Sequence, residues 1–339
     1  MKFKKIAALS TAVIMSASML VGCGNNKSKE NTDKSFKIGM VADIGGINDE
    51  SFNQSAWEGL QKAEKDFGIE VKVIESKQAS EYLQNMESLL DEDVDMVIGV
   101  GYTMKEDIEK QAKNYPDKQF VLIDETYDSI PENVTPLLFR ENEAAYLTGL
   151  VAGKMTENNN VGFIGGIQTP VISRFEYGYK AGVKEANKDC NVNVQYAGTF
   201  SDAAKGKSIA NQMYGNGSDI ILAAAGGTGL GSIESAKEQN KYAIGVDRDQ
   251  SDLAPKNVLT SALKKVNVGV YDTVKEFIEG KLKGGQEKVY GLKEDGVGIP
   301  ETTKNLVPQE IIDYVNSMIE KIKNDEIKVP VTEEEYKSM

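Results

Sequence analysis

The sequence contains no histidine. A serine or cysteine nucleophile therefore lacks its usual base, because the Ser-His-Asp triad and the Cys-His pair both pass the proton to an imidazole ring. Most zinc sites also use histidine ligands. Paired carboxylates occur along the chain, but no base of suitable pKa stands beside a nucleophile, and no metal-ligand spacing is present. We therefore expect a protein that is not an enzyme and that uses no cofactor and no metal.

Arginine is also scarce, and acidic residues outnumber basic ones. The formal net charge of the 339 residues is -13, and only three arginines are present, Arg140, Arg174 and Arg248. An acidic surface repels the phosphates of nucleic acids and the head groups of anionic lipids. So few guanidinium groups also make a bidentate clamp for a polyphosphate hard to build. Nucleic acid is therefore excluded as a partner, and so is broad electrostatic adhesion to a membrane.

Cysteine occurs only at Cys23 and Cys190. Residues 1–22 combine a basic start, an apolar core and small residues at the end, the pattern of a secretory signal peptide. The Leu-Val-Gly motif before Cys23 resembles the bacterial lipobox, and the resemblance implies cleavage before Cys23 and attachment of a diacyl lipid, such as one carrying palmitate, to its sulfur. A signal peptide that contains a cysteine by chance is the alternative. Cys190 would then be a lone thiol with a structural role.

No apolar run of membrane-spanning length follows residue 23. Residues 24–35 are polar and have no apolar face, which is typical of a flexible tether. We therefore expect residues 23–35 to consist of the lipidated cysteine and a tether. They would hold the mature protein on the extracytoplasmic face of the cell membrane.

Beyond the tether, strand-like and helix-like segments alternate, and the composition, with 40% hydrophobic and 27% charged residues, is that of a soluble globular protein. This alternation predicts an α/β fold with mostly parallel sheets. The predicted strands cover residues 36–42, 69–75, 94–100, 119–124, 160–165, 192–197, 219–225, 242–247 and 258–263. The predicted helices cover residues 51–67, 80–91, 103–114, 141–156, 174–188, 202–214, 231–239, 266–282 and 308–323, while residues 284–306 look irregular.

The chain also repeats itself at a constant offset of 123 residues. The matched pairs are Gly39 and Gly162, Phe52 and Phe175, Gly59 and Gly182, Ile69 and Val192, and Asp124 and Asp247. Coincidence between two similar αβ patterns is the alternative. The repeat predicts two similar lobes, each a doubly wound parallel sheet, with ligand-binding loops past the carboxyl ends of the strands. We expect residues 36–140 plus about 257–283 in the first lobe and 141–256 plus about 284–325 in the second.

The stretch 39–52 passes from a strand through Asp43 and a glycine pair to Ser51, a candidate helix N-cap ahead of Phe52. In a cleft between two lobes, Phe52 and Phe175 would approach from opposite sides and form a slot for a flat heteroaromatic ligand. The alternative for each phenylalanine is the first core residue of an amphipathic helix.

Polar residues gather at the predicted strand ends. Asp43, Asp124 and Asp247 are poor strand residues, and as hydrogen-bond acceptors they suit base N–H groups or ribose hydroxyls. The same aspartates also fit helix caps and turns. Three further residues, Asn48, Asp49 and Asn53, add donors and acceptors, although each also fits ordinary turn chemistry.

Two further candidate binding features follow predicted strands later in the chain. Gly226 and Gly227 follow a strand and open a helix, so backbone N–H groups there have room to approach a ligand. The run lacks the lysine of an ATP-binding loop. Lys264 follows the predicted strand 258–263 and suits a sugar hydroxyl or an ion pair with Asp247; a solvated lysine is the alternative.

Several of these segments resemble one family, the basic membrane protein (BMP) family of bacterial lipoproteins. The similarity covers roughly residues 36–325 and is carried by Asp43-Ile-Gly-Gly-Ile-Asn-Asp-Glu-Ser-Phe-Asn-Gln-Ser-Ala-Trp-Glu-Gly59, Ala224-Ala-Gly-Gly-Thr-Gly229, Gly245-Val-Asp247 and Leu259-Thr-Ser-Ala-Leu-Lys264. The resemblance implies the periplasmic-binding-protein type I fold, with three crossings between the lobes. It also implies a purine nucleoside ligand, such as guanosine, inosine or adenosine, and delivery to the permease and ATPase of an ABC importer.

The resemblance assigns roles to residues as well. It implies that Phe52 stacks on the base, that Asp43 and Asp124 contact the base edge, and that Asp247 and Lys264 hold the ribose. The backbone of Gly226 and Gly227 would lie nearby. Phe175 is the expected second stacking residue on the strength of the repeat, and Phe200 competes with it because it too follows a strand.

Other functions remain open at this point. The same fold also serves receptors for sugars and other small solutes, and a surface sensor or adhesin would need no transporter. An enzyme acting on nucleosides is the weakest alternative. We expect the protein to be a monomer.

Overall fold

The computed structural model describes residues 36–339. The signal peptide expected over residues 1–22, the lipidation of Cys23 and the tether over residues 23–35 therefore lie outside the described residues. Among residues 36–339, no helix is both long enough and apolar enough to cross a membrane.

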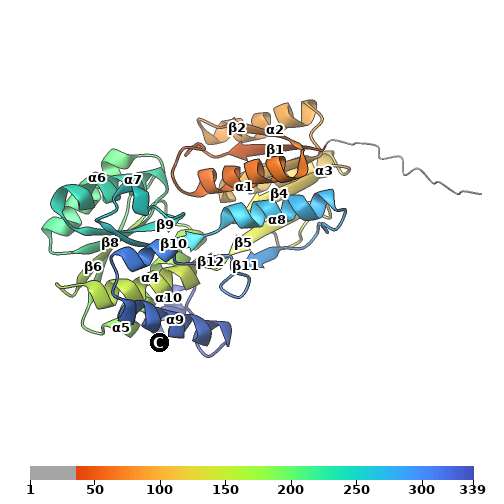
Figure 1. Cartoon of the computed structure of the whole chain (residues 1–339). Coiled ribbons are helices and arrows are strands. Elements are labelled where there is room, and N and C mark those ends of the chain that lie inside the picture. Colours follow the sequence, from red (N-terminus) through yellow and green to blue (C-terminus); the bar gives the residue numbers. More distant parts are fainter. Residues whose placement is uncertain (1–35) are drawn as a thin grey trace, which may run out of the picture. The chain divides into compact units, whose positions relative to one another are not determined.

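The first lobe is built on a sheet of six strands in the order β11-β5-β4-β3-β1-β2, and all neighbours in it are parallel. The strands are β1 (Lys37–Ala42), β2 (Glu70–Glu75), β3 (Met96–Val100), β4 (Gln119–Ile123), β5 (Val134–Phe139) and β11 (Lys288–Tyr290). The helices of this lobe are α1 (Phe52–Phe67), α2 (Tyr82–Asp91), α3 (Lys105–Asn114) and α8 (Val266–Ile278). Figure 1 shows α1 and α8 side by side along the sheet.

Both faces of this sheet are buried, as expected for parallel strands. Met40 of β1 packs into one apolar cluster with Leu60 of α1 and Val270 of α8. The next residue, Val41, packs into a second cluster with Met86 of α2. Because successive side chains of a strand point to opposite faces, the alternation places helices on both sides.

The second lobe is built on a sheet of six strands in the order β12-β10-β9-β8-β6-β7, in which only the pair β10–β12 is antiparallel. The strands are β6 (Asn160–Gly165), β7 (Asn191–Tyr196), β8 (Ile220–Ala224), β9 (Tyr242–Asp247), β10 (Val258–Lys264) and β12 (Val297–Gly298). The helices are α4 (Glu141–Met155), α5 (Pro170–Ala186), α6 (Ala203–Gly215), α7 (Gly227–Gln239), α9 (Gln309–Lys323) and the short α10 (Glu333–Lys337).

The two sheets have equivalent strand orders, which confirms the α/β fold with two doubly wound lobes. Close helix packing explains why glycine occurs at both of the matched positions, Gly59 and Gly182. A Cβ atom at Gly59 would lie 2.4 Å from the carbonyl oxygen of Asn267 on α8, and one at Gly182 would lie 2.0 Å from that of Tyr146 on α4. In each lobe, the glycine allows the backbones of two crossing helices to lie in direct contact.

The expected lobe boundaries need two corrections. The strand β10, expected in the first lobe with residues 257–283, pairs with β9 in the second sheet. The strand β11, expected in the second lobe, pairs with β5 in the first sheet. The chain therefore passes from one sheet to the other three times, between β5 and α4, between β10 and α8, and between β11 and β12.

A few expected elements differ in their extent. The strand β5 was not expected; it contains Pro136, a residue that weakens a strand prediction. Helix α5 starts at Pro170 because Thr169 caps it, its Oγ1 accepting from the N–H of Ile172 at 3.3 Å, with proline at the first helical position. Helix α7 begins at Gly227, four residues before the expected start at residue 231. Short strands and a 3-10 helix (Glu301–Asn305) occupy the segment expected to be irregular.

Candidate ligand-binding site

A cavity lies where loops from both lobes meet at the carboxyl ends of the strands. Its empty volume, part of which is open to solvent, is about 650 Å³, within the range of small-molecule sites. It is lined by Asp43, Gly45, Asp49, Phe52, Asn53, Gly101, Tyr102, Asp124, Thr169, Val171, Ile172, Phe175, Phe200, Ala224, Ala225, Gly226, Val246, Asp247 and Lys264.

Most of the residues singled out in the sequence meet in this one cavity. They are Asp43, Asp49, Phe52, Asn53, Asp124, Phe175, Gly226, Asp247 and Lys264. Two do not line it. Asn48 is exposed on the loop before α1, and Gly227 is the first residue of α7, behind Gly226.

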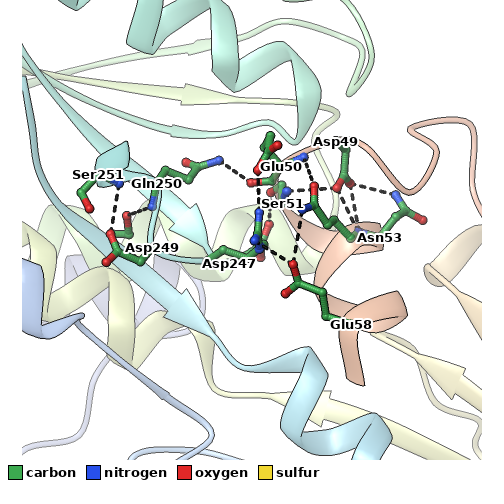
Figure 2. A network of polar contacts seen from close by, with 12 residues as sticks. Asp49, Glu50, Ser51, Asn53, Glu58, Asp247, Asp249, Gln250 and Ser251 are labelled. Atoms are coloured by element: carbon green, nitrogen blue, oxygen red, sulfur yellow. Dashed lines mark hydrogen bonds and ion pairs between the residues drawn. The ribbon is translucent and has the colours of Figure 1, made fainter. Parts of the chain in front are cut away.

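Asp49 organises the loop that enters α1. Its carboxylate accepts from the backbone N–H groups of Ser51 (3.0 Å), Asn53 (2.9 Å) and Gln54 (3.1 Å). Ser51 occupies the N-cap position but makes no side-chain capping bond, and its hydroxyl instead donates to Asp247 in the second lobe. Figure 2 shows this arrangement. The expected capping role of Ser51 is therefore wrong, because a carboxylate two residues earlier satisfies the free N–H groups.

Asp43 and Asn53 are locked together. The side-chain Nδ2 of Asn53 donates to Asp43 Oδ1 at 2.8 Å, and the backbone N–H of Asp43 donates back to Asn53 Oδ1 at 3.1 Å. The backbone N–H of Gly45 donates to the same Asp43 Oδ1 at 2.8 Å. Burial raises the pKa of Asp43 to about 6, although the hydrogen bonds from Gly45 and Asn53 work against it. The bonded oxygen fixes the carboxylate, and Oδ2 lies toward Gly101 at the cavity.

Asp247 faces the cavity from the second lobe. Burial raises its pKa to about 6, while nearby Lys264 and the Ser51 hydroxyl lower it. Asp43 and Asp247 are therefore two carboxyl groups that change charge just below neutral pH.

Lys264 is the cation of the cavity. Its residue is 1% exposed, and its ammonium forms an ion pair with Asp124. Burial by itself lowers the pKa of Lys264, but the surrounding carboxylates Asp124, Glu141 and Asp247 outweigh burial, so the pKa lies above its usual value. The sequence suggests Asp247 as an ion-pair partner of Lys264. Asp247 lies close enough to influence the pKa of Lys264, but the ion pair itself is with Asp124. The second oxygen of Asp124, Oδ1, is buried and has no hydrogen-bond partner among the described residues.

Three phenylalanines and Tyr102 supply the aromatic part of the lining. The ammonium of Lys264 lies 4.7 Å from the ring centre of Phe52, a cation–π distance. Phe175 is 3% exposed and belongs to the large apolar cluster, yet it also lines the cavity. Phe200 lines the same cavity beside Gly226. Neither Phe52 nor Phe175 is sealed in the core of a separate lobe.

The sequence reasoning missed a group of lining residues, chiefly Tyr102, Thr169, Val171 and Ile172. Tyr102 follows Gly101 directly after β3, and Thr169 follows β6 in the position equivalent to the loop after β1. A rule that every loop after a parallel strand faces the cleft would have found both. Ile172 and Val171 lie in the first turn of α5, whose start was placed four residues late.

The chain is similar to known proteins over most of its length. The family model for PnrA-like ABC transporter substrate-binding proteins (Bmp) matches residues 36–333. The chain is 38% identical to the CD4+ T-cell-stimulating antigen of Listeria monocytogenes, over 96% of this chain and 99% of that protein. It is also 38% identical to the ABC transporter nucleoside-binding protein BmpA of Lactococcus lactis, over 87% of this chain and 91% of that protein.

The fold is also found among solved structures. An ABC transporter solute-binding protein from Aeropyrum pernix superposes with a TM-score of 0.82 at 27% sequence identity. The match covers 89% of this chain and 96% of the other.

Proposed function

This chain belongs to the Bmp family of PnrA-like ABC transporter substrate-binding proteins, and on that premise we propose that it captures a purine nucleoside for import. The family consists of extracytoplasmic binding proteins, not enzymes. The nucleoside would bind in the cavity between the lobes and pass to the permease and ATPase subunits of the transporter.

The observation that carries the proposal is the combination of aromatic rings and carboxylates around one cavity. Phe52 reaches it from the first lobe, and Phe175 and Phe200 reach it from the second. Flat aromatic faces favour a flat ligand, because base–aromatic stacking contributes about 1–3 kcal/mol per base. A heteroaromatic base satisfies the carboxylates as well, because its N–H groups donate to them.

The charge of the lining supports an uncharged ligand. Four aspartates, Asp43, Asp49, Asp124 and Asp247, line the cavity, with Lys264 as the only lysine and no arginine among its lining residues. Such a site repels the phosphate of a nucleotide. A nucleoside offers the base and the ribose hydroxyls without that charge.

We assign the residues as follows. Phe52 stacks on the base, and Asp43 and Asp124 accept from the base edge. Asp247 and Lys264 hold the ribose, close to the backbone of Gly226. Since Asn48 and Gly227 do not line the cavity, we give them no contact with the ligand.

A thermal-shift comparison tests this function. Guanosine, inosine and adenosine should each raise the melting temperature, and at equal concentration the tighter ligand should raise it more, because a ligand that binds only the folded state stabilises it by mass action. Ribose, free guanine and guanosine monophosphate should raise it less. A melting temperature that responds to sugars and not to nucleosides would contradict the proposal.

We also propose that Cys23 carries the lipid anchor. The support is the lipobox-like sequence before it and the extracytoplasmic location of the family. Cells expressing Cys23→Ser should release the protein from the membrane fraction, and mass spectrometry of the wild-type amino terminus should show the diacyl modification. An unmodified Cys23 in the mature protein would contradict this assignment.

A further inference from the structure

The three arginines of this chain are all found where the two lobes join or touch. Arg140 lies between β5 and α4, at the first crossing. Arg174 of α5 binds Glu141, the first residue after that crossing, at 2.5 Å. Arg248 of the second lobe binds carboxylates of the first. Lysine supplies the rest of the positive charge, so the planar, bidentate guanidinium group is restricted to the lobe boundary.

Arg248 is the one that joins the lobes directly. Its Nη1 donates to Glu50 Oε2 at 2.6 Å, and its Nη2 donates to Glu58 Oε1 at 2.8 Å. Glu50 lies on the loop before α1, and Glu58 lies on α1 itself. Each of the two outer nitrogens thus holds a different carboxylate of the opposite lobe, the forked geometry that distinguishes arginine from lysine.

The neighbouring backbone presents these side chains to one another. On the second lobe, the N–H of Arg248 donates to the carbonyl of Val246 at 2.7 Å, and Asp247 between them has a φ of 64°. On the first lobe, Glu50 has a φ of 51°. Residues other than glycine seldom adopt this left-handed conformation, and where they do, the surroundings hold them in it.

Two glutamines support the contact. Gln54 of α1 accepts from the backbone N–H of Glu50 at 3.1 Å and donates to the carboxylate of Glu58 at 3.3 Å, so it ties the backbone at Glu50 to the Glu58 side chain. Gln250, which is buried, donates from Nε2 to the carbonyl oxygen of Glu50 at 2.8 Å and accepts from Val246 at 3.0 Å. Figure 2 shows Gln250 beside Glu50 and Ser51 beside Asp247, two contacts between the lobes.

We propose that Arg248, Glu50 and Glu58 form a clasp that holds the two lobes together and sets the rate at which a bound ligand leaves. The clasp adjoins the cavity through Asp247 but contributes none of its three side chains to the lining. It therefore acts on ligand retention through the lobes and not through contact with the ligand. Its bonds exist only while the lobes lie together as they do here, so they favour the closed state.

The surroundings of the clasp suit a contact that must open again. The side chain of Arg248 is 25% exposed, and those of Glu50 and Glu58 are more exposed than that. Partly exposed ion pairs contribute modestly and weaken as salt screens them. A receptor that delivers its ligand to a transporter needs such a closure, strong enough to slow escape and weak enough to be opened.

Stopped-flow measurement of guanosine dissociation from wild-type protein and from Arg248→Gln tests the clasp. The variant should release guanosine about fivefold faster, the equivalent of roughly 1 kcal/mol, with an association rate within about twofold of the wild type. Raising the salt concentration should speed release from the wild type and change the variant little. Arg248→Glu should release faster still, and adding Glu58→Arg should restore much of the loss.

A matched control is present in the second lobe. Lys207 also binds two glutamates, Glu234 and Glu238, and its side chain is 27% exposed, but all three residues lie in α6 and α7 of one lobe. Lys207→Gln removes the same charge and should leave the dissociation rate unchanged. Equal dissociation rates for wild type and Arg248→Gln, or equal changes in Arg248→Gln and Lys207→Gln, would overturn the clasp.

The part of this inference that concerns ligand release depends on the proposed function, so a second measurement needs no ligand. Small-angle scattering of the ligand-free protein at low salt should give a larger radius of gyration for Arg248→Gln than for the wild type or Lys207→Gln. High salt should bring the wild type toward the variant. If guanosine does not bind at all, the proposed function fails, while an unchanged radius of gyration would independently refute the clasp.

Discussion

Asp124 and Asp247 occupy the same position in the two lobes, 123 residues apart, and share the same unusual backbone conformation. Asp124 has a φ of 72° immediately after β4, and Asp247 has a φ of 64° at the end of β9. Aspartate tolerates this left-handed conformation better than most residues. In each lobe, the turn sends a carboxylate into the shared cavity and toward a partner from the other lobe, Lys264 for Asp124 and Ser51 for Asp247.

Replacing only one partner of the ion pair between Asp124 and Lys264 should destabilise the folded protein. Asp124→Asn leaves a buried ammonium with less compensating charge, and we expect it to lower the free energy of unfolding by about 3 kcal/mol. The double variant Asp124→Asn with Lys264→Met removes both charges and should recover at least half of that loss. Urea denaturation measures both, and a double variant as unstable as Asp124→Asn would show that the ion pair is not the cause.

Phe52 should matter for binding far more than for folding. Phe52→Ala removes one face of the proposed slot and should weaken guanosine binding by more than about tenfold, the scale of one lost stacking contact. Its ring is only partly buried, so the melting temperature of the ligand-free protein should fall little. Phe52→Tyr, which keeps the aromatic face, should bind within a few-fold of the wild type. Calorimetry decides the point, and unchanged affinity in Phe52→Ala would remove the stacking role.

Acid should weaken binding through Asp43 and Asp247. The pKa of each is raised to about 6 in the folded protein, so each carboxylate that must accept from the ligand loses that capacity as the pH falls through 6. For one such group, affinity should fall about tenfold between pH 7 and pH 5. Calorimetry at several pH values, in buffers with different ionisation enthalpies, counts the protons released on binding. A constant affinity across this range would contradict the carboxylate contacts.

The same two groups should act on stability in the opposite direction. Their pKa values in the folded state exceed the ordinary value of 3.8, so the folded protein binds protons more readily than the unfolded chain between about pH 4 and pH 6. Their contribution to stability is therefore complete below pH 4 and is lost as the pH rises through 6. Asp43→Asn removes one of these charges and should stabilise the ligand-free protein at pH 7 by about 2 kcal/mol, with less gain at pH 4.

The crossing of α5 with α4 should not tolerate a methyl group at Gly182. A Cβ atom there would lie 2.0 Å from the carbonyl oxygen of Tyr146, so Gly182→Ala must push the two helices apart. We expect a loss of about 3 kcal/mol in the free energy of unfolding, at the upper end of overpacking effects. Gly215→Ala, at the end of α6, is the matched control and should be neutral or slightly stabilising, because a Cβ atom there would meet no atom of the described residues within 4 Å beyond its chain neighbours and its own helix. Equal effects of the two substitutions would show that the close approach is not the reason for the glycine.

The sequence predicted most of the fold because its signals are local. Continuous apolar runs such as β3 and β8 and the aspartates that follow strands mark the alternating elements and the cleft edge. The repeat added the pairing of Gly59 with Gly182, which the structure explains by helix crossings. Sheet membership near the end of the chain has no such local signal. Strand β11 pairs with β5, with Lys288 opposite Leu137, and no spacing in the sequence marks that pairing. Strand β10 pairs with the preceding strand, β9, and was misassigned because nothing local shows that the chain crosses to the first lobe only after β10.

The sequence predicted those site residues that lie at the carboxyl ends of strands. Asp43, Asp124 and Asp247 follow that rule, and all three line the cavity. The capping role of Asp49 in place of Ser51 depends on the contact between Ser51 and the other lobe, which only the folded chain reveals. The clasp of Arg248 with Glu50 and Glu58 joins residues about 190–200 positions apart, so no spacing pattern predicts it.

A crystal structure of the protein grown with guanosine tests the central claim most directly. The account predicts the purine ring against Phe52 in the cavity between the lobes, with Phe175 or Phe200 on its other face. It also predicts that Asp43 lies at the base edge and that Asp247 lies at the ribose. A nucleoside bound outside this cavity, or a cavity occupied by a different class of solute, would contradict it.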